Sequence, residues 1–320
     1  MCYTRGTRLI IAHNIKMSIG FLKKFKKLFE TENSLFLQGK AVAPWVLTIG
    51  KIQTILEKRT KWKPMEENTM LHKWSVKIPE LSGDKERRVY VYLPDYYDID
   101  PNRHYPVMYM FDGHNVFLDE DATYGKSWGM NNFMNWTRKP LIIVGVECNH
   151  EGTCRLEEYA PFDFENGELS YIHARGRQYM EWLIHVLKPY IDSHYRTLWD
   201  RNNTIICGSS MGGLMALYGA TEYNHMFQRA ACLSPSVWVD PGKVLSMVAR
   251  ADIKTDTTIY MDYGSREIFN HHSTAEALRS TAQMLLTKRV NPAFRIVPGG
   301  THSEGSWEKQ IPVFMDWLGL

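Results

Sequence analysis

One stretch, residues 204–214, constrains the fold of this chain more than any other. It begins as a short apolar run that predicts a buried strand and runs into Leu214 and its neighbours, which predict a helix. Between them stands Gly-x-Ser-x-Gly, as Gly208-Ser209-Ser210-Met211-Gly212. In a strand–turn–helix context this pentapeptide predicts a nucleophile elbow, in which the central serine has a strained backbone and glycine avoids clashes on either side. We therefore expect the Ser210 hydroxyl to stand above the edge of a sheet.

The rest of the chain from about residue 71 predicts an α/β fold. Residues 72–78 and 87–93 alternate in polarity and predict half-buried antiparallel strands. Short apolar strands separated by helices follow, which predicts a mainly parallel central sheet with helices on both faces. The strands are expected at 106–111, 141–146, 205–207, 230–233, 258–261 and 293–297, with a long helix at 171–190 and others centred near Val244, Leu278 and Phe314. In such sheets the chemistry lies at the carboxyl ends of the strands.

The first 68 residues differ from the rest, so we expect an N-terminal extension (1–68) followed by a catalytic domain (69–320). Residues 18–30 predict an amphipathic helix with four lysines on one side, at positions 23, 24, 26 and 27. Such a helix is typical of proteins that bind a membrane surface or a partner protein. Weak contact of residues 18–30 with a membrane surface is therefore one hypothesis. The other is a helix that packs on the body, or a poorly ordered extension.

Composition narrows the function classes. A formal net charge of +3 over 320 residues is too small to indicate nucleic-acid binding. No run approaches the roughly 18 apolar residues of a membrane span, and residues 9–12 are too short for the apolar core of a signal peptide. Five cysteines without C-x-x-C spacing predict free thiols in a reducing compartment and no metal site formed by the cysteines. We expect a cytoplasmic protein. The sequence does not indicate its oligomeric state.

A serine nucleophile needs an imidazole base, which in turn needs a carboxylate to orient it. Chains with this elbow have the order serine, acid, histidine. His302 follows the last predicted strand in a glycine-flanked loop, where a base has to be. Glu267 and Asp262 both follow the preceding strand; we favour Glu267 because its longer side chain extends from the loop, and Asp262 remains the alternative.

An ester carbonyl also needs donors for its oxyanion. The Met211 amide is one candidate, and the backbone amide of His114, in the loop after strand 106–111, is the second. Arg155, in a polar loop expected above the elbow, either binds a substrate oxygen or pairs with Glu157 or Glu158. Trp238 either stacks on an aromatic acyl group or packs in the core.

From about residue 71 to its end the chain resembles the esterase D-like "putative esterase" family of α/β-hydrolases. The resemblance rests on the segments 105–113, 155–161, 208–213, 233–238, 262–267 and 300–302, together with Trp307. It implies an α/β-hydrolase fold and a serine esterase with no metal or organic cofactor. Members often have Gly-x-x-Asp or Gly-x-x-Glu at the acid loop, which supports Glu267. Where many relatives have His-Gly, this chain has Asp112-Gly113, which resembles the siderophore-esterase branch and weakens an S-formylglutathione hydrolase assignment.

The substrate hypotheses are a siderophore-type lactone or other small ester, or a feruloyl or acetyl ester of plant-polysaccharide fragments. Acyl transfer to an acceptor other than water stays open as well. In a different class, the chain is a non-catalytic binding protein that keeps the fold.

Overall fold

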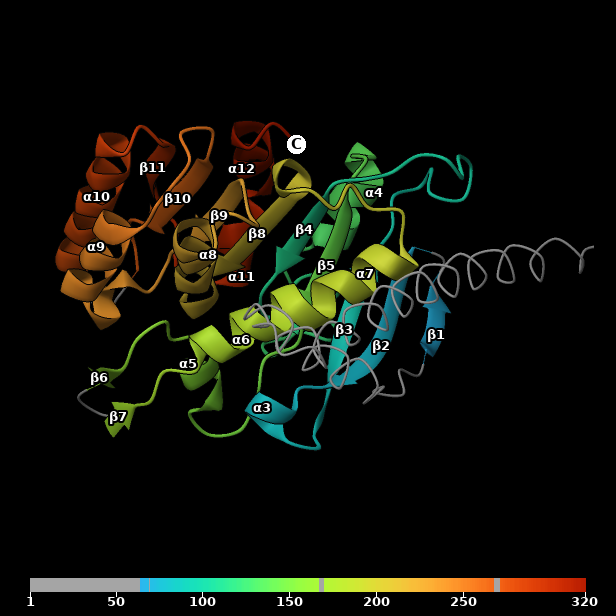
Figure 1. Ribbon diagram of the computed structural model, residues 1–320, viewed down its shortest axis with the longest axis horizontal. Helices are drawn as coiled ribbons and strands as arrows, with labels where there is room; N and C mark the ends of the chain where they lie inside the picture. Colours follow the sequence, from blue (N-terminus) through green and yellow to red (C-terminus); the bar gives the residue numbers. More distant parts are fainter. Residues whose placement is uncertain (1–63, 69, 167–169, 268–270) are drawn as a thin grey trace, which may run out of the picture. The chain divides into compact units, whose positions relative to one another are not determined.

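The computed structural model describes residues 64–68, 70–166, 170–267 and 271–320 (Figure 1). The chain divides into two compact units, Met1–Thr60 and Lys61–Leu320, and the described residues all belong to the second. The amphipathic helix predicted over residues 18–30 lies outside them. The predicted domain boundary after residue 68 leaves the strand Pro64–Asn68 in the N-terminal extension, although this strand pairs with the sheet.

Within the described residues, nine strands form one sheet in the order β1-β2-β3-β5-β4-β8-β9-β10-β11. The first three strands run antiparallel to their neighbours, and the pairs from β5 through β4 to β11 are parallel. The strands are β1 Pro64–Asn68, β2 Leu71–Lys77, β3 Glu86–Tyr92, β4 Val107–Met110, β5 Ile142–Val146, β8 Thr204–Ser209, β9 Arg229–Leu233, β10 Thr258–Gly264 and β11 Asn291–Val297, and a separate hairpin joins β6 Phe164–Asn166 to β7 Ser170–Ile172. The predicted mainly parallel sheet with antiparallel N-terminal strands is confirmed.

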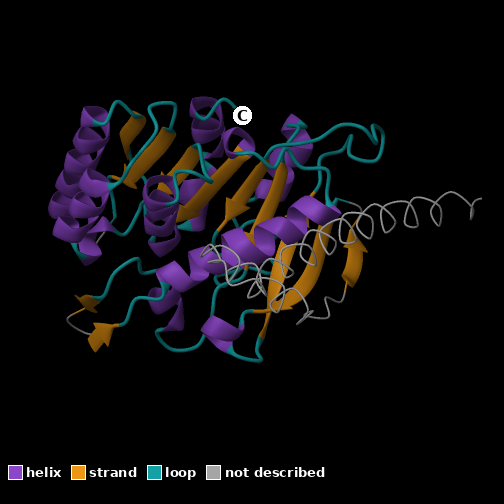
Figure 2. Ribbon diagram, viewed as in Figure 1, coloured by secondary structure: helices purple, strands orange, loops and turns teal. Residues whose placement is uncertain are grey.

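Helices cover both faces of this sheet (Figure 2). One face buries a cluster of apolar residues beneath α6 to α10, and the other buries a second cluster with α4, α11 and α12. The helices are α3 Pro79–Ser82, α4 Met130–Thr137, α5 Cys154–Glu158, α6 Gly176–Trp182, α7 Lys188–His194, α8 Met211–Glu222, α9 Pro241–Arg250, α10 His271–Thr287, α11 Glu304–Glu308 and α12 Ile311–Trp317, with short 3₁₀ turns η1 Gly113–Asn115, η3 Arg201–Asn203 and η4 Val237–Val239 and a π-helical turn η2 Leu183–Leu187.

Strand β3 differs from its prediction. Alternation predicted a half-buried strand, yet Tyr90 and Tyr92 on its second face are as buried as Val89 and Val91 on the first. The tyrosines fill the second apolar cluster, and the Tyr92 hydroxyl donates to Asn135 Oδ1 at 3.0 Å. The alternation counts tyrosine as polar because of its hydroxyl. Its ring nevertheless packs like an apolar side chain, since only the hydroxyl needs a hydrogen-bond partner.

The long helix predicted over residues 171–190 is also different. Helix begins only at Gly176, and the chain passes through the π turn η2 before α7. Tyr171 instead belongs to the β6–β7 hairpin, where Asp163 accepts hydrogen bonds from the Tyr171 hydroxyl and the Ala174 amide. A Cβ on Gly176 would lie 2.4 Å from Ala160 O, so the helix start is packed against the loop that contains α5.

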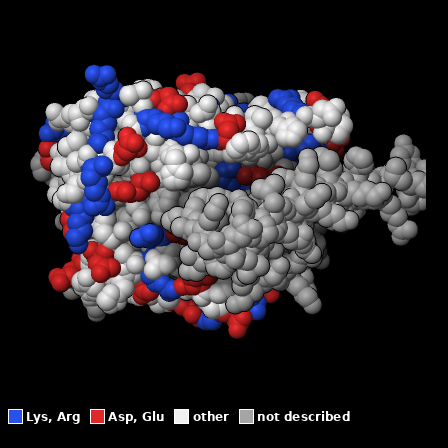
Figure 3. Space-filling view, in the orientation of Figure 1, with Lys and Arg blue, Asp and Glu red and all other residues white. Residues whose placement is uncertain are grey.

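None of the helices in the described ranges combines the length and the apolar character needed to cross a bilayer. On the face drawn in Figure 3, the described lysine and arginine side chains are interspersed with aspartate and glutamate. Mixed charge on that face agrees with the small net charge of the whole chain.

Candidate active site

The turn between β8 and α8 has the strained geometry that the pentapeptide predicts. Ser210 adopts φ 57° and ψ −126°, a region that non-glycine residues rarely occupy. A Cβ on Gly208 would lie 2.5 Å from Gly212 O, and one on Gly212 would lie 2.9 Å from Phe111 Cβ. Only glycine fits on either side, so these two residues are what lets the chain place a serine at the tip of the turn.

Ser210 lies where two cavities meet. A cavity of about 740 Å³ and one of about 210 Å³ are both lined by Ser210 and His302. The Ser210 hydroxyl lies 3.4 Å from Ser236 Oγ, and no hydrogen bond joins Ser210 to His302 in this structure. Catalytic hydrogen bonds are often long before substrate binds and form only in the complex, so the shared cavities are the informative feature.

Glu267 holds His302. The Glu267 Oε2 atom lies 2.8 Å from His302 Nδ1, and the carboxylate is buried. Its other oxygen accepts hydrogen bonds from the Gly264 amide at 2.8 Å and from the Ser234 hydroxyl at 2.5 Å. Ser234 Oγ in turn accepts from Trp307 Nε1 at 3.0 Å. Because Oε1 already accepts two hydrogen bonds, the carboxylate is held with Oε2 facing the imidazole.

The loops that contain Glu267 and His302 are joined through their backbones. The Arg266 amide donates to Gly300 O at 2.8 Å, and the Ser265 amide donates to Val297 O at 3.0 Å. A Cβ on Gly264 would lie 2.4 Å from Gly300 O, so the two loops approach more closely than a side chain allows. This approach places the acid and the imidazole side by side although they are 35 residues apart.

Asp262, the alternative acid, has other partners. Its two oxygens accept from the Ser234 amide at 3.1 Å and from the Tyr260 hydroxyl at 2.9 Å, inside β10. Burial raises the pKa of Asp262 to about 7. Of the two sequence candidates, the structure brings Glu267 against His302 and leaves Asp262 in the strand.

The two predicted oxyanion donors belong to segments next to the serine in the chain or in the cavity wall. Met211 begins α8, whose first amides lack intrahelical partners. His114 lies in η1 after β4 and lines the larger cavity with Ser210. A Cβ on Gly113 would lie 2.4 Å from Gly145 C, so this turn sits tightly on β5.

Arg155 does not pair with either glutamate considered from the sequence. Its guanidinium makes a two-point ion pair with Asp112, Nε to Oδ1 and Nη2 to Oδ2, both at 2.8 Å. Burial alone would raise the pKa of Asp112, but Arg155 first of all, with smaller contributions from His114 and Cys148, lowers it below its usual value. Glu158 pairs instead with Arg87 at 2.7 Å. Arg155 therefore anchors the turn before His114 and also lines the larger cavity.

We expect Arg155→Met to lower the free energy of unfolding by about 3 kcal/mol, because it leaves the Asp112 charge buried without its partner. Urea-induced unfolding measures the change. The matched control is Arg279→Met, which removes an exposed pair with Glu276 and should cost less than about 1 kcal/mol. Equal losses in the two variants would show that the Arg155–Asp112 pair has no special structural role.

Trp238 packs partly against the larger core cluster and also lines the smaller cavity, together with Tyr263. The packing interpretation therefore agrees with the structure, and stacking on an acyl group stays a prediction. Sequence reasoning gave no role to Ser234, which bridges Glu267 and Trp307. The available signal was its position: a hydroxyl residue directly after β9, at the same sheet edge as Ser210.

Solved structures with a similar fold include an esterase. The crystal structure of the enterobactin esterase FES from Shigella flexneri matches with a TM-score of 0.58 at 18% identity. The match covers 80% of this chain and 60% of that one. At this identity the likeness concerns the fold.

Sequence relatives agree. The uncharacterized protein YbbA of Bacillus subtilis is 23% identical over 242 residues, which cover 72% of this chain and 92% of YbbA. The esterase Rv1288 of Mycobacterium tuberculosis is 30% identical over 149 residues, 46% of this chain and 29% of that protein. The family model described as "Putative esterase" matches residues 82–318, which include the elbow, the acid loop and the His302 loop. The chain belongs to this esterase family of hydrolases.

Proposed function

We propose that this protein is a serine carboxylic-ester hydrolase in which Ser210 attacks the carbonyl carbon of the substrate. His302 takes the hydroxyl proton as the new bond forms and returns it to the leaving alcohol. Glu267 orients His302 and stabilises its charged form. The acyl group is then bonded to Ser210 Oγ, and water, activated by His302, releases it as the acid.

The amides of Met211 and His114 would donate to the oxyanion of the tetrahedral intermediate. Backbone donors at a helix start and in a tight turn are fixed in advance, so they need no rearrangement as charge develops. Loss of one such donor typically raises the barrier by about 3 to 4 kcal/mol.

One contact supports this assignment most strongly: the 2.8 Å approach of Glu267 Oε2 to His302 Nδ1. An imidazole whose Nδ1 donates to a carboxylate has a free Nε2 lone pair, which is the form needed to accept a proton. His302 and Ser210 line the same two cavities. A rotation of the Ser210 side chain away from Ser236 and toward the imidazole would complete the relay.

For the substrate we propose a siderophore-type lactone or another small ester. The larger cavity, at about 740 Å³, has the volume of a typical small-molecule site. Its wall includes Arg155 and Lys126, each paired with a carboxylate, so it offers guanidinium and ammonium hydrogen-bond donors to an oxygen-rich substrate. A feruloyl or acetyl ester is the second candidate, favoured by Trp238 and Tyr263 in the smaller cavity, where an aromatic acid would stack.

The free thiols Cys148, Cys154, Cys207 and Cys232 suit the reducing environment of the cytoplasm, in which we place this activity.

A substrate panel tests this function with the full chain. We expect p-nitrophenyl acetate and at least one of three ester classes (siderophore trilactones, feruloyl esters, acetylated sugars) to be hydrolysed, with the trilactone giving the highest kcat/KM. A fluorophosphonate probe should label the protein covalently. No labelling together with no hydrolysis would favour a non-catalytic binding protein, whereas labelling with preference for a feruloyl ester would replace the substrate assignment only.

A further inference from the structure

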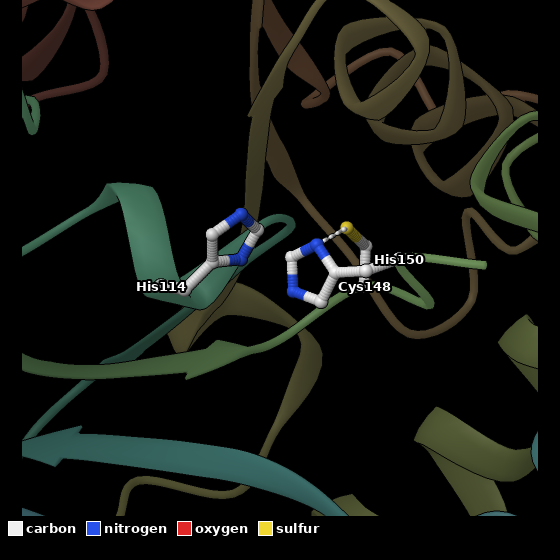
Figure 4. A group of neighbouring side chains, drawn as sticks. All are labelled: His114, Cys148 and His150. Atoms are coloured by element: carbon white, nitrogen blue, oxygen red, sulfur yellow. Dashed lines mark hydrogen bonds between the residues drawn. The ribbon is translucent and has the colours of Figure 1, made fainter. Parts of the chain in front are cut away.

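A second group of reactive side chains lines the larger cavity. His114, Cys148 and His150 each offer one potential metal-ligand atom, and these atoms lie within 4.8 Å of one another (Figure 4). His114 comes from η1 after β4, and the other two come from the loop after β5. Because β4 and β5 are parallel neighbours, the two loops leave the sheet at the same edge. This group combines one cysteine with two histidines from two different loops. The spacing of the cysteines in the sequence therefore does not indicate it.

The outer nitrogens of both histidines are already fixed. His114 Nε2 lies 3.0 Å from Thr123 Oγ1, and His150 Nε2 lies 3.1 Å from Glu147 Oε1. Metal-bound histidines usually have their second ring nitrogen held by a carboxylate, carbonyl or water in this way, which fixes the ring orientation. The arrangement leaves Nδ1 of each ring for a further partner.

The Nδ1 atom of His114 has no hydrogen-bond partner among the described residues, although the residue is only 2% exposed. Buried polar atoms in native proteins are almost always satisfied, so an orphan nitrogen in a residue that lines the larger cavity calls for a ligand. His150 Nδ1 lies 4.0 Å from Cys148 Sγ, the contact drawn as a dashed line in Figure 4.

We propose that His114, Cys148 and His150 form a binding site for a zinc-class divalent cation, with a fourth coordination position open to the larger cavity. Zinc binds imidazole nitrogen and thiolate sulfur, and zinc sites with three protein ligands keep a fourth position for water or substrate. On binding, Cys148 releases its thiol proton to solvent and its sulfur donates an electron pair to the ion. No atom of Ser210, Glu267 or His302 is needed, so the site is separate from the proposed relay.

The geometry requires only a small adjustment. With metal bonds of about 2.0 to 2.3 Å in a tetrahedron, ligand atoms stand roughly 3.3 to 3.8 Å apart, about 1 Å closer than the widest separation here. His150 is exposed, so it can move toward the buried His114 and Cys148 if its hydrogen bond to Glu147 adjusts with it. The nearby Arg155 charge is neutralised by its ion pair with Asp112, so it does not by itself exclude a cation.

Cobalt titration of the full chain tests the site, because Co²⁺ reports its own ligands spectroscopically. After treatment with EDTA, we expect one equivalent of Co²⁺ to produce a sulfur-to-cobalt charge-transfer band and the intense visible bands of tetrahedral geometry. One equivalent of Zn²⁺ should remove both. Cys148→Ser should abolish the charge-transfer band and weaken Co²⁺ binding by more than about 100-fold. This loss exceeds what is usual when a residue that only hydrogen-bonds to a metal ligand is replaced.

The matched control is Cys154→Ser, which changes a half-buried thiol in α5 and should leave the spectrum intact. His150→Ala provides an independent test should Cys148→Ser fold poorly, because the His150 ring is exposed; it should shift the visible bands and weaken binding. Weak six-coordinate binding, or a charge-transfer band that persists in Cys148→Ser, would overturn the site. So would unchanged spectra and affinity in His150→Ala.

Discussion

Replacing Ser210 with alanine is expected to lower kcat/KM for p-nitrophenyl acetate by at least about 10⁴-fold, because the proposed reaction has no other nucleophile at that point. Alanine keeps a Cβ at φ 57°, so the strained turn and its packing should be unchanged. Covalent labelling by a fluorophosphonate should disappear with the activity. Hydrolysis within tenfold of wild type would contradict the assignment of Ser210.

Two further variants separate chemistry from folding. Ser210→Gly should be equally inactive, but its free energy of unfolding should rise by about 1 kcal/mol because glycine adopts the turn without strain. Ser193→Ala removes an exposed hydroxyl at the end of α7, away from both cavities, and should leave activity and labelling unchanged. An inactive Ser210→Gly that is more stable than wild type would show that a non-glycine residue at this position costs stability.

The parts of this site that follow from local sequence were predictable. Gly208 and Gly212 fit a turn that excludes any side chain, and such a turn leaves its signature in five consecutive residues. Most of the parallel strands were predictable for a similar reason, since they are short apolar runs, although β11 also contains Asn291 and Arg295. Pro292, near the start of β11, is tolerated because alternate amides of an edge strand point away from the sheet and need no partner there.

Pairings between distant loops were not predictable in the same way. Arg155 meets Asp112, 43 residues away, while two glutamates next to it in sequence have other partners. Ser234 bridges Glu267 and Trp307 through contacts that no spacing rule describes. These contacts depend on the order of strands in the sheet, so the sequence could supply candidate residues for the site but not their partners.

The choice between Glu267 and Asp262 leads to the second large effect. Glu267→Gln should lower kcat by about 10³- to 10⁴-fold, as expected when a triad histidine is forced into the wrong tautomer. The glutamine carbonyl would keep the bonds from Ser234 and the Gly264 amide, so its NH₂ group would face His302 Nδ1. His302 would then accept at Nδ1 and carry its proton on Nε2, where it cannot take one from Ser210.

Asp262→Asn is the matched comparison, because it makes the same chemical change five residues earlier in the chain. We expect its kcat to stay within about tenfold of wild type, since Asp262 is bonded to the Ser234 amide and Tyr260 rather than to His302. Steady-state kinetics, with thermal unfolding to confirm folding, distinguish the two variants. The reverse result would identify Asp262 as the acid. For that to happen its carboxylate would have to leave two buried hydrogen bonds and displace Glu267, whose contacts with Ser234, Gly264 and His302 already fill the space beside the imidazole.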